Sequence, residues 1–246
     1  MVRRLLAPTA LLVAAAGSLV ACDDGSPTAD PPAHRSSTPA PPRPSATRPS
    51  SPPVTPSNDP IVAPGPGPGP GPSDGTPRRA LLSIPALGLR DVAVVPYRGH
   101  TDDAPGTRIQ DRGRAASPFG PRGGVGPGGV GNYQVTGHRT SSTHPFAMLP
   151  TLRPGASVVV VAGGVRYVYE VRRTRETSFR SARSLAEQRA AVPGHPGATP
   201  TRAFVTLSTC ATQEDHAEGN YWSDELHNPE HRIDKIGLLV RTVVAD

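Results

Sequence analysis

The chain has 246 residues, which is enough for one or two domains. It contains 32 prolines and only 4% aromatic residues, so part of it cannot contribute to a hydrophobic core. The formal net charge is +6, but the basic residues form no long cluster and have no aromatic residues interleaved with them. This pattern argues against a nucleic-acid-binding surface and favours a soluble surface that happens to be basic.

Residues 1–22 have the pattern of an export signal. Two arginines near the start are followed by an apolar, alanine-rich run of about 17 residues, at the short end for a membrane-spanning helix. The run ends in Leu19-Val20-Ala21-Cys22, which resembles the lipobox of bacterial lipoproteins. The resemblance implies that Cys22 carries a diacylglyceryl group, whose two acyl chains would hold the protein at a membrane. An ordinary cleaved signal and an uncleaved anchor are the alternatives.

Residues 23–78 are predicted to be a disordered linker. They hold 18 of the 32 prolines, no aromatic residue and no leucine, and residues 64–72 alternate strictly between proline and glycine. Such a segment buries too little apolar surface to offset the entropy lost on ordering. We expect an extended stalk between the membrane and a folded domain.

Residues 79–246 are predicted to form one mainly β domain. Glycine, proline and charge dominate residues 99–131, and the six glycines of residues 123–131 lack the lysine and the following helix of a phosphate-binding loop. One short helix is predicted over residues 184–191. Many short strands with scarcely any helix favour a closed or nearly closed β-barrel. The clearest strand patterns cover residues 80–84, 91–95, 157–162, 165–171, 202–209 and 236–244.

Cys210 is the candidate nucleophile. If Cys22 is acylated, Cys210 has no partner for a disulfide, and an unpaired thiol is unusual in an exported protein. It stands at the carboxyl end of the predicted strand 202–209, and His138 closes a strand-like run, 132–136. If these strands are neighbours, the thiol and the imidazole can meet. A cysteine–histidine pair is the smallest set of side chains that supports nucleophilic acyl transfer. The alternative is a buried cysteine that acts as a small apolar residue.

Three segments together carry a family resemblance. Thr206-Leu207-Ser208-Thr209-Cys210 matches the T-L-x-T-C signature of sortases, and Gly137-His138-Arg139 matches the G-H-R segment of actinobacterial class E sortases. Arg232 follows in the expected order. The resemblance covers about residues 84–244 and implies the sortase-type closed eight-stranded barrel with one or two short helices.

The resemblance also implies a reaction. A cysteine transpeptidase of this family cleaves a C-terminal sorting motif of the L-A/P-x-T-G type between Thr and Gly, forms a thioacyl intermediate and transfers the protein to a cell-wall amine. Cys210 would be the nucleophile, His138 the acid and base, and Arg232 the group that holds the carbonyl oxygen. Thr209 and Trp222 are candidate substrate-binding residues. We expect no cofactor and no metal.

The implied partners are exported proteins with a sorting motif and an amine on peptidoglycan or its lipid-linked precursor. The predicted location is the extracytoplasmic face of the bacterial membrane, with a lipid or signal anchor and the catalytic domain in the cell wall. We expect a monomer that binds no nucleic acid.

Alternatives exist for each role. His144 is a rival base, and Arg202 and Arg241 are rivals of Arg232. The acidic and histidine side chains of residues 211–231 could bind a metal, although a solvated loop is favoured because no short ligand pattern appears. That connection is longer than sortases usually have, and Asp234-Lys235 interrupts the apolar strand expected after the arginine.

Two other functions compete with the sortase assignment. The first is another cysteine enzyme of the cell wall. L,D-transpeptidases also place histidine before cysteine, but their S-x-G-C motif is absent, and papain-like wall peptidases have the reverse order. The second is a catalytically inactive, wall-binding lipoprotein.

Overall fold

The computed structural model describes residues 73–245. The predicted export signal 1–22, including Cys22, and residues 23–72 of the predicted linker lie outside the described residues. Within residues 73–245, no helix is both long enough and apolar enough to cross a membrane.

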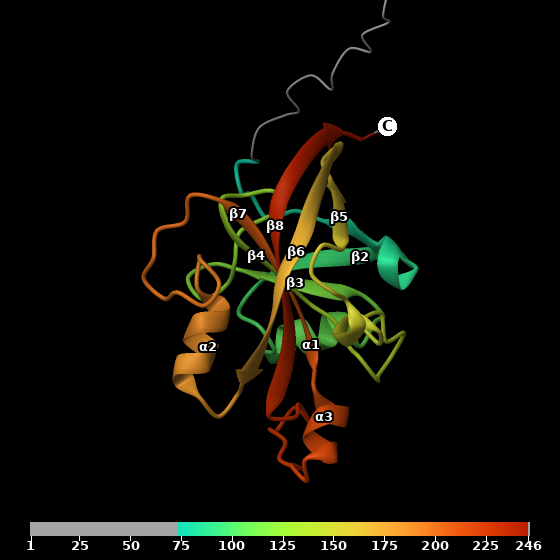
Figure 1. The fold of residues 1–246 in the computed structure, drawn as a ribbon, viewed down its shortest axis with the longest axis vertical. Helices are drawn as coiled ribbons and strands as arrows, with labels where there is room; N and C mark the ends of the chain where they lie inside the picture. Colours follow the sequence, from blue (N-terminus) through green and yellow to red (C-terminus); the bar gives the residue numbers. More distant parts are fainter. Residues whose placement is uncertain (1–72, 246) are drawn as a thin grey trace, which may run out of the picture. The chain divides into compact units, whose positions relative to one another are not determined.

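Eight strands close into a barrel in the order β1-β2-β3-β4-β7-β8-β6-β5 (Figure 1). The pairs β2–β3 and β4–β7 are parallel, and the other neighbours are antiparallel. This confirms the predicted mainly β fold with a closed eight-stranded barrel. The strands are β1 (Ala80–Ile84), β2 (Leu89–Arg98), β3 (Ala115–Phe119), β4 (Gly131–Thr136), β5 (Ser157–Ala162), β6 (Val165–Ser178), β7 (Ala203–Cys210) and β8 (His231–Val244).

The helices are all short. The one predicted helix is present as α2 (Ala182–Arg189), and it begins where the hydroxyl of Ser181 accepts a hydrogen bond from the backbone of Ser184. Two further α-helices, α1 (Ala104–Gln110) and α3 (Thr212–Ala217), were not predicted. Two 3₁₀ turns, η1 (Pro85–Leu87) and η2 (Leu149–Thr151), complete the described elements.

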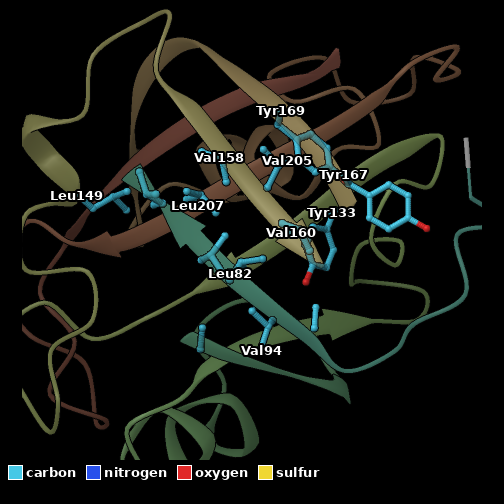
Figure 2. Close-up of a cluster of buried hydrophobic side chains, with 14 of the residues drawn as sticks. Leu82, Val94, Tyr133, Leu149, Val158, Val160, Tyr167, Tyr169, Val205 and Leu207 are labelled. Carbon is cyan, nitrogen blue, oxygen red and sulfur yellow. The ribbon is translucent and has the colours of Figure 1, made fainter. Parts of the chain in front are cut away.

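Alternate residues of the strands fill the barrel. On β4 and β7 the inward residues are Tyr133, Val135, Val205 and Leu207, each at most 1% exposed. Figure 2 shows Tyr133, Val205 and Leu207 packed with apolar side chains from β1, β2, β5 and β6, including Leu82 of β1. Since side chains alternate along a strand, the even-numbered residues of β4 and β7 point outward.

The outward face of β4, β7 and β8 is covered rather than solvated. Asn132 donates to the backbone carbonyls of Gln188 and Ala190 at the end of α2, at 3.1 and 3.0 Å. The side chain of Gln188 in turn donates to Asp234 on β8 at 3.0 Å. A polar layer therefore lies between α2 and the barrel.

The glycine-rich loop 123–131 holds the beginning of the described chain. Gly126 N donates to Gly75 O at 2.7 Å, and Ser73 N donates to Gly128 O at 3.1 Å. A Cβ on Gly126 would lie 2.1 Å from the carbonyl oxygen of Thr76. The glycines permit this close backbone approach, so residues 73–78, assigned to the linker from sequence, pack against the barrel.

Strand β8 begins at His231, five residues before the start predicted from sequence. Asp234 and Lys235 do not interrupt it, because each has buried polar partners. The Asp234 carboxylate accepts from Thr177 at 2.6 Å, and Lys235 Nζ donates to Pro150 O at 2.8 Å. Polar residues that look like a strand breaker in the sequence are thus accommodated within a continuous strand.

Candidate active site

Strand pairing places Cys210 and Arg232 opposite each other. Cys210 is the last residue of β7, Arg232 is the second residue of β8, and the two are register partners in the antiparallel pair. Both belong to the outward-facing set. Their side chains therefore share one face at one end of the barrel.

The parallel pair β4–β7 brings His138 to the same level. Thr136 pairs with Ser208, and the ladder continues one step further, with Gly137 N donating to Ser208 O at 3.2 Å. Residue 138 therefore lies alongside residue 210, and the alternation of side chains directs both toward the outer face of the barrel. The structure thus brings His138, Cys210 and Arg232 to one edge of the sheet.

Cys210 is half-buried and is the free cysteine of the described chain. Burial raises the pKa of its thiol, and the carboxylates of Asp102 and Asp224 act in the same direction, while Arg232 and Arg139 oppose them. The net direction is upward. The protonated thiol is therefore favoured over the thiolate.

Arg232 is fully buried, and four contacts fix its guanidinium. Nε lies 3.3 Å from Asp102 Oδ1, Nη1 donates to backbone carbonyls of Pro229 and His231, and the guanidinium carbon lies 4.4 Å from the centre of the Phe179 ring. Among the described residues, neither Nη2 nor Nε has a hydrogen-bond partner, and both atoms are buried. Nη2 takes no part in the ion pair with Asp102, which is formed by Nε.

The guanidinium of Arg232 keeps its positive charge although it is buried. Burial alone would lower the pKa of the guanidinium, but the nearby Asp102 carboxylate and Cys210 outweigh that effect and raise it. The contact of Nε with Asp102 Oδ1 at 3.3 Å is an ion pair rather than an aligned hydrogen bond, since Nε lacks a hydrogen-bond partner among the described residues. Asp102 also has a left-handed backbone, with φ +62°, which is uncommon for a residue other than glycine.

Arg139 was not singled out from sequence, although it belongs to the Gly-His-Arg segment. Only 8% exposed, it donates from Nη1 to the backbone carbonyl of Cys210 at 3.2 Å and forms an ion pair with Glu214. Nη2 donates to Gln213 at 2.7 Å. It therefore ties the backbone of the candidate nucleophile to α3.

The rival residues lie elsewhere. His144 sits in an exposed turn, where its ring contacts only the carbonyl of Ser142 at 3.3 Å. Arg202 precedes β7 at the end opposite Cys210, and Arg241 is exposed far along β8 from Arg232.

The two candidate substrate-binding residues are placed differently from the three above. Thr209 is 2% exposed, and its hydroxyl donates to Gly137 O at 2.8 Å, so it links β7 to the segment that carries His138. Trp222 is half-buried in the connection between α3 and β8. In residues 73–245, no group of three or more His, Cys, Asp or Glu side chains is arranged to hold a metal ion.

A cavity of about 660 Å³ lies beside Arg232 and shares Asp102 and Phe179 with it. Its walls come from the β2–α1 connection, the first residue of α1, the segment between β6 and α2, one face of α2 as far as its last residue, and the loop before β8. The lining residues are His100, Thr101, Asp102, Asp103, Ala104, Phe179, Leu185, Arg189, Asp224, Glu225 and Leu226.

Comparison with known proteins points to one family. The family model described as the sortase domain matches residues 82–222. Among solved structures, the SrtA sortase from Actinomyces oris has a TM-score of 0.52 at 19% identity, covering 70% of this chain and 85% of that one. Sortase E1 from Streptomyces coelicolor, solved with a tripeptide in its active site, has a TM-score of 0.49 at 24% identity, covering 71% and 94%. No curated protein matches the sequence significantly.

Proposed function

This chain belongs to the sortase family, whose model matches more than half of it, and is accordingly a transpeptidase; on that premise we propose that it acts through a thioacyl intermediate on Cys210. The proposed substrate is an exported protein with a C-terminal sorting motif of the L-A/P-x-T-G type, cut between Thr and Gly. The observation that carries the proposal is the placement of Cys210, His138 and Arg232 at one edge of the sheet.

In the first half-reaction, His138 takes the thiol proton and Sγ of Cys210 attacks the carbonyl carbon of the motif's Thr. Negative charge develops on the carbonyl oxygen, and Arg232 Nη2, a donor without a hydrogen-bond partner among the described residues, stabilises it. The C–N bond then breaks, and His138 returns its proton to the leaving amine of Gly. The product is a thioester on Cys210.

The second half-reaction reverses these roles. An acceptor amine loses a proton to His138 and attacks the thioester, the C–S bond breaks, and the sulfur recovers the proton. The proposed acceptor is an amine of peptidoglycan or of its lipid-linked precursor. Sortases act at the cell surface, and we propose that lipidation of Cys22 or the uncleaved signal anchors this one as a monomer.

Incubation with fluorogenic L-A-x-T-G and L-P-x-T-G peptides, with and without an amine acceptor, tests the proposal. We expect cleavage that the amine accelerates, an acyl-enzyme that hydroxylamine releases, and no turnover by Cys210→Ala. Unchanged turnover in Cys210→Ala would refute the role of the thiol. Cleavage with no transfer to any amine would instead indicate a peptidase.

A further inference from the structure

A carboxylate outside the three-residue site contacts the imidazole directly. Asp111 is the C-cap residue of α1, and its Oδ1 lies 2.9 Å from Nε2 of His138. The His138 side chain is 15% exposed, whereas that of Asp111 is 57% exposed. No sequence motif singled out Asp111, which lies in the irregular stretch 99–131.

We propose that Asp111 is a positioning residue for the acid–base steps, which sets the tautomer and the ring orientation of His138. This inference rests on the proposed role of His138 as the acid and base. A neutral imidazole has one N–H donor and one lone pair, and an ionised carboxylate can only accept. The contact therefore favours the tautomer with the proton on Nε2. Nδ1 is then the nitrogen whose lone pair takes the proton from the thiol or from the acceptor amine.

The same carboxylate acts again after proton transfer. Once Nδ1 has accepted a proton, the Nε2–H···Oδ1 contact becomes a charge-assisted hydrogen bond, which is stronger than that of the neutral ring. The additional stabilisation is present only when the imidazole is charged, so it favours the transition state over the resting enzyme. Asp111 itself touches neither the thiol nor the substrate.

The surrounding backbone holds the pair in place. Asp111 N donates to Thr107 O at 2.9 Å, and Asp111 O accepts from the Ser142 hydroxyl at 3.0 Å. Thr143 Oγ1 donates to Gly113 O at 3.2 Å. Hydrogen bonds therefore link the turn after α1 to the loop after His138 on both sides of the ion pair. A carboxylate on a fixed turn is a better orienting group than one on a mobile loop.

The competing explanation is an incidental surface ion pair, which would contribute little to stability and nothing to catalysis. Turnover alone cannot separate the two, because any local disturbance lowers it. The tautomer of His138 does separate them, since ¹⁵N chemical shifts distinguish a proton on Nε2 from one on Nδ1. This readout requires no activity, so it also separates failure of this inference from failure of the proposed function.

The variants are Asp111→Ala and Asp111→Asn, with Glu218→Gln as the matched control. Glu218 is an exposed carboxylate just after α3 that has no described contact with the site. We expect both Asp111 variants to lower kcat by about tenfold to a hundredfold with KM nearly unchanged, as loss of an orienting group does elsewhere. The control should keep both constants.

For the tautomer measurement, the Cys210→Ala protein is compared with the Cys210→Ala/Asp111→Ala protein, so that the thiol does not contribute. We expect Nε2–H in the first and a mixture of tautomers in the second. An unchanged tautomer would overturn the inference whatever happens to kcat, and a changed tautomer with kcat within twofold of the wild type would overturn it as well. If the wild type transferred no peptide, the proposed function would fail, and the tautomer alone would decide whether Asp111 orients the ring.

Discussion

Replacing Arg232 should damage stability and catalysis for separate reasons. The side chain is fully buried, and its main ionic partner, Asp102, is only 8% exposed. Arg232→Ala leaves that carboxylate buried without its cation, and breaking a buried pair in this way costs about 3–5 kcal/mol of unfolding free energy. It also removes the Nη2 donor, and loss of one oxyanion donor lowers kcat by about 10²- to 10³-fold.

Arg232→Lys separates the two effects. A lysine keeps a positive charge near Asp102. Its ammonium cannot reproduce the contacts of the planar guanidinium, which pairs with Asp102 through Nε, donates to two carbonyls through Nη1 and lies over the Phe179 ring. We therefore expect Arg232→Lys to recover part of the lost stability while kcat stays at least about tenfold below the wild type.

The assays are urea unfolding and steady-state transfer of a fluorogenic peptide to an amine. Arg241→Lys is the matched control, since Arg241 is an exposed arginine on the same strand. Arg241→Lys should change neither the free energy of unfolding nor kcat. If Arg232→Lys transferred peptide at the wild-type rate, the assignment of the oxyanion role to the Nη2 donor would be wrong.

Three further outcomes follow from the described contacts. Burial and then Asp102 raise the pKa of Cys210, so iodoacetamide should alkylate the wild type at a higher pH than an ordinary thiol. Asp102→Asn should shift this pH dependence of alkylation to lower pH, and an unshifted dependence would contradict the role of Asp102. Burial lowers the pKa of His231, but its hydrogen bond with Asp215 and the negative charges of Asp215, Glu176 and Glu230 together outweigh this and raise it above 6.5. Its stabilisation should be complete below that pH and disappear as the pH rises through the folded value, so the stability lost in His231→Gln should be larger at pH 5 than at pH 8. Arg139→Ala should lower both kcat and stability, the latter by about 1–3 kcal/mol, because it frees the carbonyl of Cys210 and two partners on α3; wild-type values for both would show that this link is dispensable.

The sequence was sufficient to predict a β-barrel and the carboxyl ends of β4 and β7. The strands predicted over residues 157–162 and 165–171 are present as the antiparallel pair β5 and β6, which the Gly163–Gly164 turn joins. Cys210 and His138 were both placed at strand ends, and the parallel β4–β7 pair brings their positions to one level. These features depend on local periodicity and turn chemistry, which a single sequence displays.

The supporting residues could not be predicted, because they come from segments without periodicity. Asp102 and Asp111 flank α1 in a stretch rich in glycine, proline and charge, and each contacts a partner far away in the chain, Arg232 and His138 respectively. An Asp-Ala-Pro sequence at 103–105 is a reasonable start for a helix, with Asp103 as its N-cap. Even so, a predicted helix would not reveal which side chains face the site.

Asp234 shows a different limit. A charged residue in a strand is ordinarily taken to face water, yet the outward face of β8 is covered by α2, and Asp234 is buried there between Thr177 and Gln188. Burial raises the pKa of this carboxyl, although the hydrogen bonds from Thr177, Ser208 and Gln188 oppose the rise. The pattern of the strand alone cannot report a covering helix that comes from elsewhere in the sequence.

This covering layer also accounts for the electrostatics of the site. Cys210 and Arg232 are at the edge of the covered face, where water is partly excluded. A fixed hydrogen-bond donor stabilises a developing negative charge more strongly there than in bulk solvent. A lone buried guanidinium there would favour a permanent thiolate, but Asp102 offsets its charge and burial disfavours the anion. The protonated thiol is therefore favoured at rest, and in the proposed mechanism proton transfer to His138 is the step that activates it. The proposed orienting carboxylate of Asp111 would assist that step without a stronger positive field at the sulfur.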